Sequence, residues 1–165
     1  MTEIESKIIL GIDPGTNIIG WGVVKKEGSK FIALKFGCVN VKSKTDPGDG
    51  LLLIYEAISD IIKNEKPSEM AIERLFFFRN QKTVMSVAEA RGVVILSAKK
   101  NKIPVFEYTP LQIKQAVSGY GRADKKQIQE MIKLTFGLKE SPKPDDVADA
   151  LAVAVCHAST NQKIR

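Results

Sequence analysis

A short apolar run that ends in an acid and a turn constrains this chain more than any other feature. The segment 7–13 reads KIILGID, and Pro14 and Gly15 directly after it break extended structure. Because another apolar stretch follows at once, the pattern predicts a central strand with a hairpin partner. Asp13 is then expected at the end of its strand, at the edge of the sheet, beside glycines that let a phosphate approach the backbone. This arrangement suits metal-assisted phosphate chemistry.

Three further acids stand at the edges of apolar elements. Glu73 ends a short predicted strand at 69–73, and Asp146 and Asp149 open an amphipathic segment at 145–159. Residues three apart on a helix share one face, with Cβ atoms roughly 5–6 Å apart. Asp145 points about 100° away around the helix, so it is expected to cap the helix rather than bind metal.

These four acids match what phosphodiester hydrolysis by water requires. Two divalent ions about 3.5–4 Å apart align the nucleophile and neutralise the leaving oxygen, and hard ions need several carboxylate oxygens. Each acid alone has an ordinary structural explanation: it could be a turn residue, or an acid in the first turn of a helix that interacts favourably with the helix dipole. Together they favour a metal site formed by Asp13, Glu73, Asp146 and Asp149.

The order of predicted elements indicates an α/β fold in one domain. Three strands in a meander precede alternating helices and strands, which predicts a sheet with an antiparallel edge. Residues 1–165 contain no repeat, low-complexity tract or long linker. The strands are predicted at 7–13, 19–26, 31–41, 69–73 and 103–108, with a loop at 45–50 and helices at 52–62, 82–100, 110–117, 125–136 and 145–159.

Composition limits the function classes. Hydrophobic residues make up 44% and charged residues 27%, as in globular proteins, and the net charge of +6 favours a polyanionic partner. No apolar run approaches the roughly 20 residues of a membrane span, and residues 1–5 carry acids, unlike a secretory signal. Cys38 and Cys156 are isolated, which favours core thiols in a reducing compartment. We therefore expect a cytoplasmic protein that does not enter membranes.

Two segments near the acids are suited to contact nucleic acid. Residues 75–81 read LFFFRNQ, and three consecutive Phe cannot all face one side of a strand or helix. Exposed aromatic rings can stack on unpaired bases; the alternative is a hydrophobic plug. Residues 119–121 (GYG) are flanked by four basic residues, an arrangement that can follow a bent phosphate backbone, while a solvated helix face is the alternative. These four are Lys114, Arg122, Lys125 and Lys126.

Six segments, in order over nearly the whole chain, resemble the RuvC family of Holliday junction resolvases. They are GIDPGTNIIGWGV at 11–23, AIERLFFFRNQ at 71–81, ARG at 90–92, PVFEY at 104–108, IKQAVSGYGRADKKQI at 113–128 and DDVADALAVAVCHA at 145–158. The resemblance implies an RNase H-like fold, with a mixed five-stranded sheet flanked by helices. It also implies a homodimer that cuts two symmetric strands of a four-way DNA junction, with Mg²⁺, in recombination and repair.

The resemblance also implies roles for individual residues. The family's four acidic positions fall on Asp13, Glu73, Asp146 and Asp149, and some relatives carry His where Asp146 stands. The acids would hold Mg²⁺, with two ions per site and Mn²⁺ as a substitute. Phe76 and Phe77 would stack on bases, Arg79 would lie near phosphates, and DNA contacts would come from Lys114, Lys125 and the basic segment with Arg122. A branch-migration helicase accompanies related resolvases.

Two symmetric cuts require two sites, so one site per chain implies two chains related by a two-fold axis. Helix 82–100 is the expected interface, because its apolar and small residues cover more of its circumference than one sheet requires. The alternative is a helix buried inside one domain. The residues concerned are Val84, Val87, Ala88, Gly92, Val94, Ile95 and Ala98.

Other functions have specific requirements. An actin-like ATPase or sugar kinase needs two lobes and a second phosphate loop, which this chain lacks. An RNase H-like nuclease acting on RNA, or a protein that binds junctions without cutting them, shares more of the pattern. His157 lies about 12 Å along the helix from Asp149, so we expect a packed histidine, and Trp21 is expected in the core.

Overall fold

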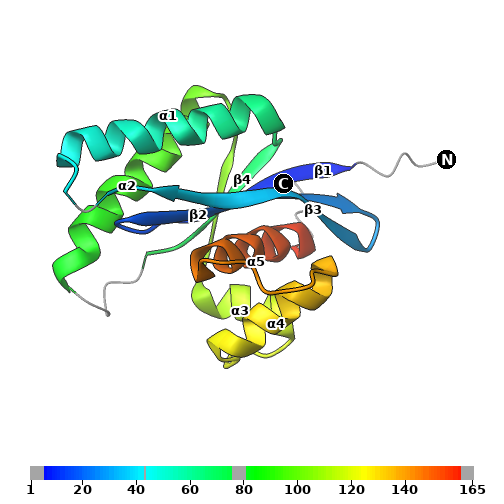
Figure 1. Cartoon of the computed structure of the whole chain (residues 1–165). Coiled ribbons are helices and arrows are strands. Elements are labelled where there is room, and N and C mark those ends of the chain that lie inside the picture. Colours follow the sequence, from blue (N-terminus) through cyan, green and yellow to red (C-terminus); the bar gives the residue numbers. More distant parts are fainter. Residues whose placement is uncertain (1–5, 43, 76–80, 161–165) are drawn as a thin grey trace.

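The computed structural model describes residues 6–42, 44–75 and 81–160 and consists of a mixed sheet with helices on both faces (Figure 1). The strand order is β3-β2-β1-β4-β5, and β2 runs antiparallel to both of its neighbours. The elements are β1 (Lys7–Asp13), β2 (Ile18–Glu27), β3 (Lys30–Asn40), α1 (Pro47–Glu65), β4 (Glu69–Glu73), α2 (Gln81–Lys100), β5 (Val105–Tyr108), α3 (Pro110–Ser118), α4 (Lys125–Phe136) and α5 (Asp145–Ser159).

The predicted α/β sheet with an antiparallel strand is confirmed, and most predicted bounds agree within two residues. Helix α1 begins at Pro47, inside the expected loop. The Asp46 carboxylate accepts hydrogen bonds from the backbone N–H groups of Gly48 and Asp49, and proline suits the first helical turn. The expected cap at Asp145 is wrong, because Pro144 takes the N-cap position of α5 without a side-chain hydrogen bond.

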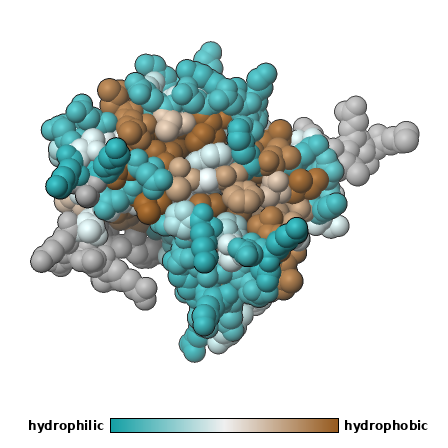
Figure 2. Space-filling model, in the orientation of Figure 1, coloured by the Kyte–Doolittle hydropathy of each residue, from teal (hydrophilic) through white to brown (hydrophobic). Residues whose placement is uncertain are grey.

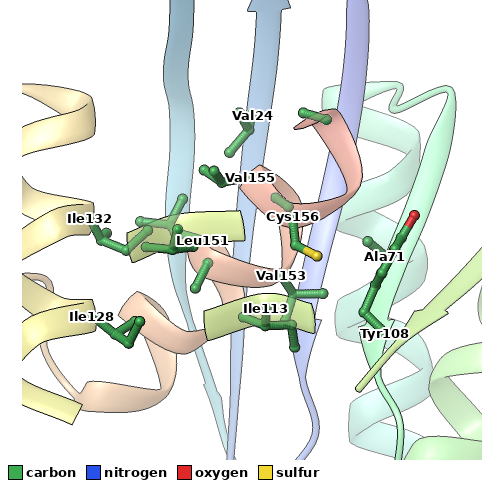
Figure 3. Packing of buried hydrophobic residues seen from close by; sticks show 14 of the residues in the cluster. Val24, Ala71, Tyr108, Ile113, Ile128, Ile132, Leu151, Val153, Val155 and Cys156 are labelled. Carbon is green, nitrogen blue, oxygen red and sulfur yellow. The ribbon is translucent and has the colours of Figure 1, made fainter. Parts of the chain in front are cut away.

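Two apolar layers enclose the sheet. On one face α1 and α2 cover side chains such as Leu10 and Ile12 of β1, and on the other face α5 lies against the sheet, with α3 and α4 outside it (Figure 1). Figure 3 shows Leu151 and Val155 of α5 between the strands and Ile132 of α4. An α-helix that is apolar on all sides must be buried on all sides. Helix α5 is therefore the central helix of this domain.

Strand β3 forms one edge of the sheet and carries apolar surface. Figure 2 shows hydrophobic residues where β3 crosses between α1 and α5, and Leu34 and Phe36 of β3 are 45% and 38% exposed. A register shift at Val23 and Val24 marks a bulge in the pairing of β2 with β3, and Lys30 and Lys35 are exposed on the strand. Bulges and lysines both oppose pairing with another sheet edge.

The histidine expected to pack is a satisfied core residue. His157 accepts or donates hydrogen bonds at both ring nitrogens, with Nδ1 2.6 Å from Tyr108 Oη and Nε2 2.7 Å from Glu69 Oε2. Its ring stacks on Phe106 at 4.6 Å between centroids, and burial lowers its pKa. Trp21 is only half-buried, against the α1 and α2 layer, so the expectation of a core tryptophan is met in part.

Candidate active site

Two acids meet at the carboxyl edge of the parallel strands. Asp13 is the last residue of β1 and Glu73 the last of β4, and the parallel register that pairs Ile12 with Ile72 sets them side by side. Open α/β sheets bind ligands at this edge. Both acids line a cavity of about 670 Å³, together with Pro14, Arg74, Leu75, Thr83, Val84, Val87, Pro110 and Lys114.

Glycines bring α5 to this edge. A Cβ atom at Gly20 would lie 1.9 Å from the carbonyl oxygen of Asp146, and one at Gly11 would lie 2.1 Å from that of Ala150. Only a strand without side chains at these positions allows the helix backbone to touch it. These glycines therefore serve helix packing, whereas the sequence suggested that glycines here admit a phosphate. The close contact places the first turn of α5 beside Asp13.

The electrostatics show that the four acids act on one another. Burial raises the pKa of Asp13 well above its ordinary value, and repulsion from Asp149, Glu73 and Asp146 raises it further. Burial also raises the pKa of Glu73, with a contribution from Asp149, while Lys114 opposes the shift. A shift of one pKa unit corresponds to about 1.4 kcal/mol. Keeping these acids ionised in the folded protein therefore costs free energy, and a bound cation would lower that cost.

Lys125 forms ion pairs with this acid group and its neighbour Asp145. Its Nζ lies 3.4 Å from Asp149 Oδ2 and 3.3 Å from Asp145 Oδ2. Burial lowers the pKa of Lys125, but attraction to Asp149 and Asp145 outweighs it and raises the pKa. Burial raises the pKa of Asp149 despite the lysine. Asp145, expected as a cap, is thus part of an ion pair at the rim of the acid group.

The donor set fits a hard divalent ion. Carboxylate oxygens are the ligands that Mg²⁺ and Mn²⁺ prefer. Burial raises the pKa values of Asp13, Glu73 and Asp149 even though Lys125 and Lys114 oppose the increases, so a bound cation would stabilise these carboxylates further. No three His, Cys, Asp or Glu side chains within the described ranges form a ready-made cation cage. Asp13 and Glu73 line the cavity, Asp146 and Asp149 are not among its described lining residues, and Lys125 forms an ion pair with Asp149.

The predicted DNA-binding residues fall into three groups. Lys114 lines the acid cavity, and Lys125 is paired with the acids. Arg122 is exposed in the turn between α3 and α4, and the described part of the chain shows no contact between it and the acids. Phe76, Phe77 and Arg79 lie outside the described residues.

Sequence reasoning missed Arg74, which also lines the cavity. Its Nε is 3.6 Å from Glu107 Oε2, and the other oxygen of Glu107 is 2.8 Å from Arg91 Nη2. This Arg–Glu–Arg group links the end of β4 to β5 and α2. Its position directly after Glu73 was the available signal, but pairing across three elements leaves no local pattern in a sequence.

Comparison with known proteins gives a consistent result. The family model described as crossover junction endodeoxyribonuclease RuvC matches residues 9–157. Relatives of that name from Desulfitobacterium hafniense (strain DSM 10664 / DCB-2) and Clostridioides difficile (strain 630) are each 52% identical, covering 92% and 94% of this chain and 92% of each relative. A solved structure of T. thermophilus RuvC in complex with Holliday junction substrate has a TM-score of 0.88 at 34% identity, covering 92% of this chain and 93% of that one.

Fold and acid group together define a metal-dependent nuclease with the RNase H-like fold. The chain belongs to the crossover junction endodeoxyribonuclease RuvC family. The resemblance inferred from sequence is therefore confirmed, including the fold that it implied.

Proposed function

We propose that this protein resolves four-way DNA junctions by metal-dependent hydrolysis of two symmetric phosphodiester bonds, in recombination and repair. The observation that carries the proposal is the group of four mutually repelling acids at the carboxyl edge of the sheet. It occurs in a chain about half of whose residues are identical to those of named crossover junction endodeoxyribonucleases. The similar T. thermophilus RuvC was solved in complex with a Holliday junction as its substrate, which supports the same substrate here.

The mechanism assigns roles to the chain's own groups. Asp13, Glu73, Asp146 and Asp149 would hold two Mg²⁺ ions, with Mn²⁺ as a substitute. Such ions supply an activated water and neutralise the leaving oxygen. Lys114, Arg122 and Lys125 would bind phosphates and orient the strand. Phe76 and Phe77 would stack on bases unpaired at the crossover, with Arg79 near the phosphates.

Three broader features belong to the same proposal. One sheet with an apolar layer on each face supports a single domain over residues 1–165. A branch-migration helicase as partner rests on the family resemblance alone. A DNA substrate in recombination and repair favours a cytoplasmic location. Separately, no helix in the described ranges is long and apolar enough to cross a membrane.

One cleavage assay separates this function from its alternatives. Labelled four-way junction, linear duplex and RNA–DNA hybrid are each incubated with Mg²⁺, Mn²⁺, Ca²⁺ or EDTA. We expect paired symmetric cuts in the junction with Mg²⁺ or Mn²⁺ only, because Ca²⁺ adopts a larger and looser coordination. Cleavage in EDTA contradicts the metal mechanism. Preference for the hybrid indicates an RNA nuclease, and binding of the junction without cutting indicates a non-catalytic binding protein.

The proposed homodimer uses a strip of α2 that keeps Ala88 and Gly92 from the predicted set. Val94 and Ala98 lie in the core and are not available to a partner chain, whereas Val84 and Val87 are half-buried and line the acid cavity. An uncovered strip remains along the helix at spacings of three and four residues, and a Cβ atom at Gly92 would meet nothing within 4 Å. The strip consists of Met85, Ala88, Gly92 and Leu96.

Leu96→Glu is expected to convert the dimer to monomers that nick junctions singly or not at all. Leu96 is 56% exposed, so the charge costs the monomer little, whereas burying it between two helices is unfavourable. Leu134→Glu is the matched control, since Leu134 is 64% exposed on α4, on the other face of the sheet. Sedimentation and a paired-cut assay report the result. A monomeric unmodified protein that still makes paired cuts contradicts the proposal.

A further inference from the structure

The ion pair between Lys125 and Asp149 suggests how metal and DNA binding are connected at the proposed site. Asp149 is one of the four acids proposed to bind metal, and Lys125 is one of the cations proposed to bind phosphate. Their charged atoms are 3.4 Å apart. One contact therefore occupies a group from each binding function at the same time.

The backbone of Lys125 is fixed while its charged end is free to move. Asp124 caps α4 reciprocally with Gln127, through two hydrogen bonds of 2.8 Å, and Ile128 and Ile132 are buried against α5. The Lys125 side chain is nevertheless 57% exposed and carries its ammonium group on a flexible four-carbon stem. It can leave Asp149 for a nearby phosphate without any movement of the helix.

The lysine and a divalent ion compete for the same oxygen. Attraction to Lys125 opposes the pKa increases of both Asp13 and Asp149, so this lysine already supplies part of the missing counter-charge. A metal ion that takes up Asp149 Oδ2 supplies two positive charges and makes the lysine redundant. The bound ion repels the lysine and halves the net charge of the four acids, so the attraction that holds Lys125 weakens, and Asp145, 3.3 Å away, is the partner that remains.

We infer that Lys125 is an exchangeable counter-ion: it holds Asp149 while no divalent ion is bound and transfers to a DNA phosphate when an ion takes its place. The inference rests on the proposed function and adds regulation to that site. Because linkage is reciprocal, bound DNA that withdraws Lys125 raises the metal affinity by the same factor by which metal raises the DNA affinity. The acids become fully available only when the substrate is present.

Junction binding in EDTA tests the lysine without any metal. Asp149→Asn and Asp146→Asn remove the same charge from the same helix, but only Asp149 is paired with Lys125. We expect Asp149→Asn to tighten junction binding roughly two- to fivefold more than Asp146→Asn, the range for an exposed ion pair. The excess should disappear in a Lys125→Gln background. Equal tightening by both variants, or an excess that persists without Lys125, overturns the inference.

Calcium binding without DNA supplies the second test. Ca²⁺ titration followed by thermal unfolding should give a roughly two- to fivefold lower dissociation constant for Lys125→Gln than for the unmodified protein. Lys114→Gln is the matched control, because Lys114 also lowers the pKa of an acid in the cavity without an ion pair to it. Equal gains in the two variants reveal only a general charge effect and overturn the inference. If Ca²⁺ never stabilises the unmodified protein and Mg²⁺ supports no cleavage, the proposed metal site itself fails.

Discussion

Asp13→Asn is expected to reduce junction cleavage roughly a hundred- to thousandfold, the cost of removing one electrostatic contact to a developing charge. Asp13 is the most affected member of the acid group: burial and three neighbouring carboxylates raise its pKa. An amide of the same shape cannot supply the same negative oxygen to a metal ion. Junction binding should stay equal or become tighter, because the change removes negative charge that faces DNA phosphates.

Rates of single-turnover cleavage and binding in EDTA measure these effects separately. Glu73→Gln, Asp146→Asn and Asp149→Asn should lose cleavage to a similar extent, while in EDTA Asp149→Asn should tighten junction binding more than Asp146→Asn because it releases Lys125. Asp49→Asn is the matched control, since Asp49 is an exposed acid in the first turn of α1. If Asp149→Asn kept full activity, its proposed role as a metal ligand would be wrong.

The Asp13→Asn variant should also be more stable than the unmodified protein at neutral pH. Such a result would show that the variant loses activity without unfolding. A folded-state pKa above the unfolded value of 3.8 means that the native state retains the proton longer. Native stability therefore falls as pH rises from 3.8 to the raised pKa, and the penalty remains above it. The neutral amide removes the penalty, so the gain in Tm should be full at neutral pH and vanish below pH 3.8. Loss of stability at neutral pH contradicts this account.

The position of the acids was predictable because it depends on local order. An acid at the end of each of two parallel strands must reach the same edge of the sheet, and the spacing of Asp146 and Asp149 placed both on one face of a helix. The ion pair of Lys125 was not predictable. It joins two helices whose relative position depends on the packing of Ile128 and Ile132 on α5.

Helix α2 shows a second limit of sequence patterns. Its apolar and small residues surround the axis, so the pattern predicts burial on several sides but not which side meets which neighbour. The structure assigns Val94 and Ala98 to the core and Val87 to the acid cavity, and leaves Gly92 uncovered. A charge at Val87 would therefore disturb the cavity, which is why Leu96 is the better test of the dimer.

The glycines illustrate the same limit and lead to the second large effect. Gly20→Ala is expected to destabilise the fold by about 3 kcal/mol or more, at the upper end of overpacking costs. The new Cβ would lie 1.9 Å from the carbonyl oxygen of Asp146, which is backbone and cannot rotate away. The first turn of α5 must therefore move from β2, taking Asp146 and Asp149 with it. A displacement of about 1 Å costs catalysis roughly a hundredfold.

Urea denaturation and junction cleavage at a temperature where the variant remains folded separate these two losses. For the urea measurement alone, Gly92→Ala is the matched control, because a Cβ there meets nothing within 4 Å of the single chain and alanine favours a helix interior by about 1 kcal/mol over glycine; its place in the proposed dimer strip excludes it as a cleavage control. That variant should be as stable as the unmodified protein or more so. A folded and fully active Gly20→Ala protein would mean that α5 does not need its close contact with β2 to place the acids. Because the helix carries two of the four carboxylates, the packing of one glycine and the chemistry at the sheet edge are expected to fail together.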